Sequence, residues 1–234
     1  MRILAVILAC MTVSVLARPV RSASSYRHIS YIAEKGEEPL PEGVVAVEWI
    51  GQSDSDQYIP TWIIPPPGSV LKCRFQFTDT RNSACCIGNI GTQRFGFGIS
   101  SGRFQVCTRG WVIVSSVPDT EWHDWVIDEP NGKAYIDETS VNIYSHTEYT
   151  NYDYWFANGG FPIFRRQCDG WPDFITYRAR ISSLYIGTSS GALFDAVAVR
   201  VGDGEEAVGY LYDRVSGNMF GNAGTGKLEI GPDL

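Results

Sequence analysis

Pairs of carboxylates in this chain lie close enough in sequence to be weighed for catalysis, and we consider them first. Retaining glycoside hydrolysis needs two carboxyl groups about 5 to 5.5 Å apart on one side of a cleft. Asp128 and Glu129 are adjacent at a turn, whereas Glu121 and Asp124 are three residues apart, which puts them on opposite faces of a regular strand. We therefore expect solvated turn acids here and keep a glycoside hydrolase only as the lesser alternative.

Two other motifs match catalytic signatures but lack their context. Residues 187–191 spell G-x-S-x-G, yet all three histidines precede the serine and no helical pattern follows it. Residues 221–227 spell G-x-x-x-x-G-K, yet Leu228 stands where a Ser or Thr would hold magnesium. We expect loops at both places and predict that the protein is not an enzyme.

An aromatic and polar stretch offers the chemistry of carbohydrate recognition. A Trp or Tyr ring stacks on the apolar face of a pyranose while Asp, Asn or Arg side chains hydrogen-bond its hydroxyls. Residues 152–171 carry both kinds of side chain. The candidate ligand-binding residues are Tyr154, Trp155, Asn158, Arg166, Asp169 and Trp171.

Metal chemistry receives little support from the sequence. Three histidines without paired spacing predict no catalytic transition metal, and we expect no cofactor. Calcium, which prefers hard oxygen ligands in loops, stays open, with solvated loop charge as the alternative. The loop acids concerned are Asp54, Asp56, Asp169 and Asp173.

The N-terminus has the pattern of a secretory signal peptide. Met1-Arg2 is followed by an apolar run and then by small residues, so we predict a signal peptide over residues 1–23 and a polar leader or linker over residues 24–43. One domain is expected over residues 44–234. The mature protein is predicted to be secreted, either extracellular or periplasmic.

The number of cysteines limits the disulfides that the mature chain could form. An odd number of cysteines would remain, so at least one thiol is unpaired, and because adjacent Cys85 and Cys86 do not bridge each other, any disulfide joins one of them to Cys73, Cys107 or Cys168. Buried, inert thiols are the alternative.

Removing three arginines from the 19 basic residues leaves 16 against 26 acidic ones, a formal charge of −10, which argues against nucleic acid and anionic membranes as partners.

Period-two patterns place these residues on strands. Residues 70–77 alternate apolar and polar side chains, and β-prone runs on either side of the turn at residues 129–132 predict a hairpin, with Trp125 and Ile127 on one face and Val126 on the other. Apolar residues at helical spacing are missing, and strand signals return every 8 to 12 residues or so, as in an antiparallel sandwich or barrel. Further strands are expected over residues 44–50, 57–64, 84–90, 94–99, 103–108, 111–116, 141–144, 152–157, 175–181, 193–199 and 209–213.

Three stretches together resemble bacterial concanavalin A-like, laminin G-like jelly-roll domains. Residues 47–50 with 57–59 resemble the opening strand pair, and residues 122–137 resemble the central hairpin, although Glu138 stands where the family has Gly. Residues 209–232, beginning Gly-Tyr-Leu-Tyr-Asp, are similar to the closing segment of an uncharacterised exported subgroup. The resemblance implies an all-β fold of two antiparallel sheets packed as a jelly-roll β-sandwich, and it does not imply one function.

These observations favour a secreted, lectin-like binding module without catalysis. The expected partner is a glycan or a surface protein. An extracellular structural or assembly protein that uses the sandwich as a scaffold is the main alternative.

Overall fold

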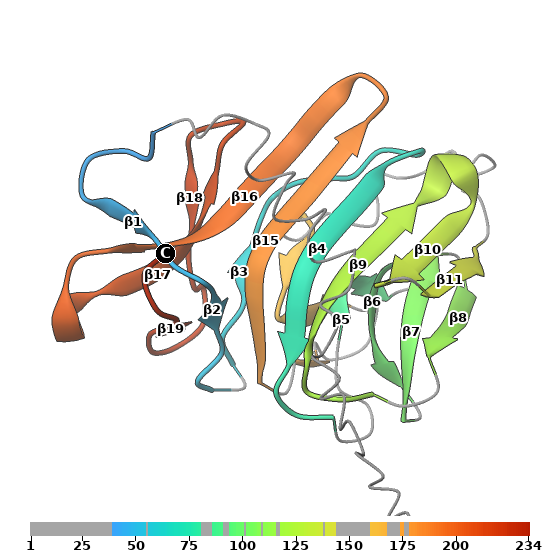
Figure 1. Ribbon diagram of the computed structural model, residues 1–234, viewed down its shortest axis with the longest axis horizontal. Helices are drawn as coiled ribbons and strands as arrows, with labels where there is room; N and C mark the ends of the chain where they lie inside the picture. The colour runs from blue at the N-terminus through green and yellow to red at the C-terminus, as the bar shows by residue number, and fades with distance from the viewer. Residues whose placement is uncertain are drawn as a thin grey trace, which may run out of the picture.

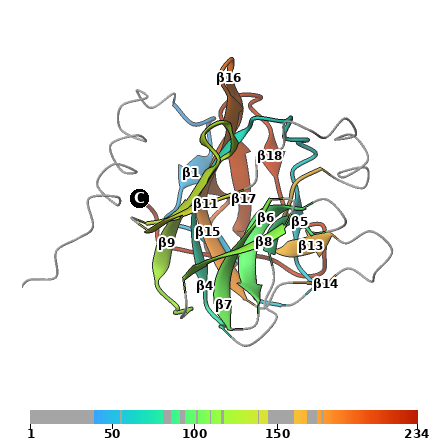
Figure 2. The same ribbon diagram turned by 90° about the vertical axis from the view of Figure 1, so that its right-hand side faces the viewer.

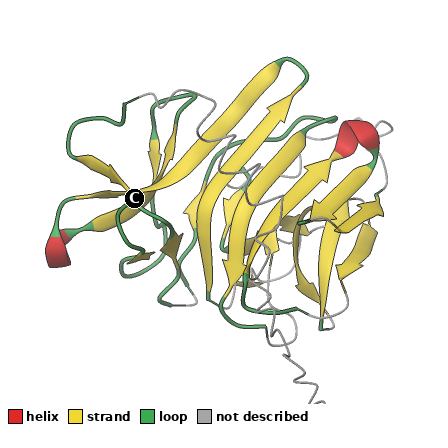
Figure 3. Cartoon of the chain, viewed as in Figure 1, coloured by secondary structure: helices red, strands yellow, loops and turns green. Residues whose placement is uncertain are grey.

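The computed structural model describes residues 39–54, 56–80, 86–90, 94–100, 102–108, 110–115, 118–137, 139–143, 160–167, 174–175 and 178–234. Strands joined by loops make up this part of the chain, with two short 3₁₀ turns, η1 (Glu129–Asn131) and η2 (Gly204–Glu206) (Figure 3). The all-β prediction is confirmed. Within the described ranges, no helix is long and apolar enough to cross a membrane.

The larger of two main sheets is antiparallel and has 11 strands (Figure 1). β1 (Val44–Ala46) pairs with β16, and β2 (Ile50–Gly51) pairs with both β15 and β19 (Glu229–Ile230). The main path runs in the order β11 (Thr139–Asn142), β10 (Lys133–Ile136), β9 (Trp122–Asp128), β4 (Val70–Phe77), β15 (Ala179–Thr188), β16 (Gly191–Val201), β17 (Val208–Asp213) and β18 (Met219–Phe220).

The smaller main sheet has six strands and lies against one face of the larger one (Figure 2). A separate pair, β3 (Ile59–Pro60) with β12 (Pro162–Ile163), lies beside it, because β12 contacts β5 and β13. The order in the six-stranded sheet is β14 (Phe174–Ile175), β13 (Arg165–Gln167), β5 (Cys86–Ile90), β6 (Arg94–Ser100), β7 (Arg103–Thr108) and β8 (Gly110–Ser115). β13 and β5 run parallel, whereas the sequence predicts antiparallel pairing throughout.

The strongest sequence patterns match the observed elements. β4 has the predicted bounds, and its side chains alternate between half-buried and buried along its whole length. The turn after β9 is the 3₁₀ turn η1, closed by Gly132 in the left-handed conformation at φ 60°. Trp125 and Ile127 are buried, while Val126 lies on the opposite face, as the hairpin pattern predicts.

Aromatic rings from both sheets meet between the layers. Trp125 of β9 stacks on Phe97 of β6 with ring centroids 4.5 Å apart, and Phe104 of β7 meets Trp125 edge to face at 5.2 Å. Phe75 and Phe77 of β4 extend this aromatic seam. Burying one such ring stabilises a fold by about 3–5 kcal/mol relative to alanine. That gain exceeds the roughly 1–3 kcal/mol cost of the Trp125 Nε1–H, which has no hydrogen-bond partner among the described residues.

Strand boundaries in the second half differ from the sequence prediction. Residues 175–181 were expected to form one strand, but Phe174–Ile175 belongs to β14 of the smaller sheet and β15 begins only at Ala179 in the larger sheet. β15 then continues to Thr188, where the G-x-S-x-G stretch forms the tight turn into β16, confirming a loop. The periodic pattern of residues 175–181 cannot show that the chain changes sheets within it.

The closing segment is joined to the first loop of the domain by side-chain amides. Gln57 Nε2 donates to the backbone oxygens of Thr225 at 3.2 Å and Lys227 at 2.8 Å. Asn222 Oδ1 accepts from the Tyr58 N–H at 3.1 Å. Gly224 packs so closely on this loop that a Cβ atom there would overlap the backbone carbonyl of Asp56.

We predict that Gly224→Ala destabilises the protein, because the added methyl group must push the two segments apart. Overpacking of this kind costs about 2–3 kcal/mol, which urea unfolding followed by tryptophan fluorescence measures. The control is Ala223→Ser, which adds one atom at the exposed neighbouring position and should leave the midpoint unchanged. Equal midpoints for Gly224→Ala and wild type would show that the contact is not tight.

Candidate functional site

The sugar-binding residues predicted from sequence fall almost wholly outside the described part of the chain. Tyr154, Trp155, Asn158, Asp169 and Trp171 all lie outside it. Arg166 lies in β13, of which only the backbone is described. This candidate site therefore stays a prediction.

Of the four loop acids considered as calcium ligands, the structure describes two. Asp169 and Asp173 lie outside the described residues. Asp56 accepts a hydrogen bond from the Thr225 hydroxyl, and the backbone N–H of Asp54 donates to Gln57 Oε1 at 3.1 Å. Within the described ranges, no group of three or more His, Cys, Asp and Glu residues is arranged to hold a metal ion.

Cys73 is the cysteine whose side chain the structure describes. It lies on the inner face of β4 as a buried free thiol, so it does not take part in the disulfides considered from sequence. Burial, and to a smaller extent the charge of Asp124, raises the pKa of this thiol well above its usual value, which keeps it protonated. The side chains of Cys85, Cys86, Cys107 and Cys168 lie outside the described set.

Trp62 is the most exposed large aromatic residue among those described. Its relative exposure is 67%, whereas the core aromatics Phe161 and Phe164 are fully buried. Two residues further on, Ile64 is 41% exposed. Trp62 and Ile64 belong to residues 59–68, a segment of ten residues without a charged side chain.

The backbone holds Trp62 outward. Thr61 donates to the carbonyl oxygen of Phe161 through both its N–H, at 3.4 Å, and its hydroxyl, at 2.6 Å. The N–H of Phe161 donates to the carbonyl of Ile63 at 2.8 Å. Because the residues on either side of Trp62 both bond to Phe161, Trp62 is an extra residue bulged out of the β3–β12 pair.

This bulge places Trp62 in a strained conformation. Its φ is 59°, in the left-handed region, where a bulky non-glycine residue is an outlier. Gly160, at φ 69°, packs directly against the backbone of Trp62 and leaves no room for a Cβ atom. Strain of this kind is characteristic of binding and catalytic sites.

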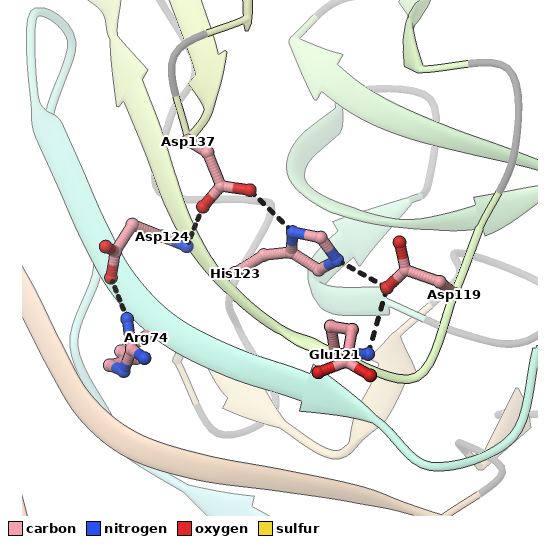
Figure 4. Close-up of polar contacts among 6 residues, drawn as sticks. All are labelled: Arg74, Asp119, Glu121, His123, Asp124 and Asp137. Atoms are coloured by element: carbon pink, nitrogen blue, oxygen red, sulfur yellow. Dashed lines mark hydrogen bonds and ion pairs between the residues drawn. The ribbon is translucent and has the colours of Figure 1, made fainter. Parts of the chain in front are cut away.

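A second constellation is a polar cluster at the start of β9 (Figure 4). The ring of His123 lies between two carboxylates: Nδ1 is 2.7 Å from Asp137 Oδ2, and Nε2 is 2.8 Å from Asp119 Oδ1. Asp137 Oδ1 also accepts from the Asp124 N–H at 3.0 Å, and Asp124 Oδ1 pairs with Arg74 Nη1 at 3.1 Å. One chain of polar contacts thus joins β4, β9 and the turn after β10.

The electrostatics of His123 and Asp137 agree with this geometry. Burial alone would lower the pKa of His123, but the hydrogen bonds to Asp137 and Asp119 outweigh it and raise the pKa above the ordinary value of 6.5. Burial would raise the pKa of Asp137, but the hydrogen bonds from His123 and the Asp124 amide lower it below 3.8. Both shifts have the direction expected when hydrogen bonding between an imidazole and a carboxylate favours the charged form of each.

Of the four acids weighed for glycoside hydrolysis, Glu121 is exposed as expected, but the expectation of solvated acids is wrong for Glu129 and Asp124, which are buried. Glu129 is buried and accepts from the Gly68 N–H at 2.9 Å, and Asp128 accepts from the backbone and side chain of Asn131. Asp124 is buried against Arg74, on the face of β9 opposite His123. In this arrangement Glu129, Asp128 and Asp124 each stabilise a turn or a strand pair.

Sequence reasoning overlooked both Trp62 and the His123 cluster. The segment containing Trp62 reads as one strand, and only its contact with Phe161, 100 residues away, reveals the bulge. The His123 contacts carried a usable signal, since Asp119 is four residues before the histidine and Asp137 follows the partner strand of its hairpin.

No family model, curated protein or solved structure matches this chain.

We predict that Trp62→Gly leaves the stability equal or slightly higher. Relief of the left-handed strain gains roughly 1–2 kcal/mol, while the extra freedom of glycine in the unfolded chain offsets about 0.5–1 kcal/mol. Urea unfolding measures the balance. Ile63→Gly is the matched control: its side chain packs against the core, so it should cost at least about 2 kcal/mol. A comparable loss for Trp62→Gly would show that the ring of Trp62 stabilises the fold.

Proposed function

We propose that the protein is a secreted, non-catalytic recognition module, lectin-like in fold and resembling the concanavalin A-like jelly-roll domains, that binds carbohydrate through Trp62. A glycan carried on a surface is the expected partner. The predicted signal peptide supports action outside the cell, where such glycans occur.

The single observation that supports this function most is the strained, outward presentation of Trp62. The ring has most of its surface in water while its backbone is fixed on both sides through Phe161. A platform that is already rigid loses little conformational entropy when a ligand stacks on it. A large aromatic ring held in this way is suited to be the main contact of a binding site.

Charge favours a neutral ligand with an apolar face. Residues 59–68 carry no charge, and the chain as a whole is acidic, at −7 with the predicted signal peptide and −10 without it. Phosphate-rich polymers and anionic bilayers would be repelled rather than attracted. The C–H face of a pyranose ring meets both conditions, because it is uncharged and apolar.

The sequence-predicted residues extend this proposal. Asn158 precedes Gly160 by two positions in the chain, and Gly160 packs on the backbone of Trp62. We propose that Tyr154, Trp155 and Asn158, with Arg166, Asp169 and Trp171, supply further stacking surfaces and hydrogen bonds to sugar hydroxyls. The alternatives predicted from sequence, a scaffold protein or a glycoside hydrolase, are separated from this proposal by the experiment below.

We predict that the protein is retained by one or more polysaccharides in affinity electrophoresis and that Trp62→Ala weakens this binding. Loss of a central aromatic contact costs about 2 kcal/mol or more, roughly a 30-fold loss of affinity. Val215→Ala removes an apolar side chain that is 49% exposed on the turn after β17 and should bind as wild type does. Trp62→Phe keeps a stacking ring and should retain intermediate affinity.

Three outcomes would contradict the proposal. Absence of retention on every glycan tested, together with self-association, would favour the scaffold. Release of reducing sugar would favour the hydrolase. Glycan binding that Trp62→Ala leaves unchanged would move the site away from residues 59–68.

A further inference from the structure

The two ring nitrogens of His123 impose a proton requirement on the polar cluster. A neutral imidazole has one N–H, so it can donate to only one of two carboxylates. His123 lies within hydrogen-bond distance of a carboxylate at each nitrogen, at 2.7 and 2.8 Å. Both contacts are favourable only when the ring carries two protons and a positive charge.

Among the described residues, the other elements packed around the ring bring no charge that would replace these contacts. From β7, the ring of Phe104 meets the imidazole edge to face at 5.1 Å. From β4, Phe75 lies opposite His123 in the strand register, and Arg74 pairs with Asp124 on the outer face. Asp137 and Asp119 supply the charges that act on the ring, and Figure 4 shows them with Glu121, Asp124 and Arg74.

The two carboxylates are anchored differently. Asp137 accepts from the Asp124 N–H as well as from His123, its own N–H donates to the Asp124 carbonyl at 2.8 Å, and its φ of 50° is a conformation that Asp tolerates. Asp119 lies in the exposed segment before β9, and half of its side chain is in water. Besides its contact with His123, Asp119 accepts a hydrogen bond at 2.9 Å from the N–H of Glu121 in the same segment.

We propose that the Asp119–His123–Asp137 bridge is a pH-sensitive latch. In weakly acidic surroundings it ties the segment before β9 to the turn between β10 and β11. When the imidazole loses its second proton, the remaining N–H stays with Asp137 and the contact with Asp119 opens. The latch shares no residue with the proposed glycan site.

The pH range of the latch follows from the direction of the two shifts. The pKa of His123 is raised on folding, so its stabilisation is fully present below about 6.5 and is lost as the pH rises through the folded pKa. The pKa of Asp137 is lowered on folding, so its stabilisation is present above about 3.8 and is lost as the pH falls through the folded pKa. The latch therefore stabilises the fold most between these two limits.

The latch fixes where the chain re-enters the larger sheet. β8 belongs to the smaller sheet and contacts β10 and β11, and the next strand along the chain is β9 in the larger sheet. Asp119 lies on the connection between β8 and β9. Loss of its contact with His123 therefore releases this connection from β9, while the β9–β10 hairpin keeps its own hydrogen bonds.

We predict that Asp119→Ala and Asp137→Ala differ in their pH dependence. Urea unfolding at pH values from about 5.5 to about 9 should show that the cost of Asp119→Ala is largest at the acidic end and falls towards the alkaline end, where only the small, pH-independent loss of the bond from the exposed Glu121 N–H remains. Asp137→Ala should be destabilising throughout, because it also removes the bond to the Asp124 amide. Asp128→Ala, at the opposite end of β9, is the matched control and should show a cost that does not vary over this range.

NMR titration of the His123 ring separates the latch from a purely structural contact, because only the latch makes the titration midpoint of the ring depend on Asp119. The His123 signal, assigned by its loss in His123→Gln, should titrate above 6.5 in wild type and at a lower pH in Asp119→Ala. Each unit by which the wild-type midpoint exceeds 6.5 should appear as a tenfold fall in the folding equilibrium constant, relative to His123→Gln, across that pH range. A midpoint at or below 6.5, or a cost of Asp119→Ala that does not change with pH, would overturn the latch.

Discussion

The register of β9 within the larger sheet is the constraint on which the rest of the structure depends. Trp125 lies opposite Cys73 of β4 and Ile136 of β10, and this register directs its ring against Phe97 of the smaller sheet. A slip by one residue would bring Asp124 and Val126 inward and expose Trp125. Since burial of such a ring contributes several kcal/mol and burial of an unpaired carboxylate costs as much, one register is strongly preferred.

The same register creates the polar cluster at the rim of the interior. His123 is two residues before Trp125, so it lies on the same face of β9 and meets Phe104, where the aromatic seam ends. Asp124 lies on the opposite face against Arg74. Asp137 bonds to the ring of one and the backbone of the other, and one side chain therefore couples the two faces of the strand. The register of β9 therefore sets both the aromatic seam and the polar cluster.

Much of the fold could be predicted from sequence because its strongest elements are local. The strict alternation of residues 70–77 and the Pro-Asn-Gly turn identify β4 and the β9–β10 hairpin without knowledge of any distant contact. The candidate site could not be predicted in the same way. The bulge at Trp62 depends on Phe161, and the change of sheet between Ile175 and Ala179 depends on which strands compete for pairing. Both are long-range effects that leave no period in the local sequence.

Trp62 shows what this long-range control implies for function. If the bulge served only to connect β3 to the rest of the sandwich, glycine or asparagine would fill the left-handed position with less strain. The fully buried aromatics of the core are held by neighbours on both sheets, but most of the Trp62 ring is in water, so packing offsets little of the strain in its backbone. A tryptophan at this position is explained if a binding partner covers the ring. A ligand that stacks on the ring would provide that cover, and the rigid attachment to Phe161 would let it do so without ordering the loop first.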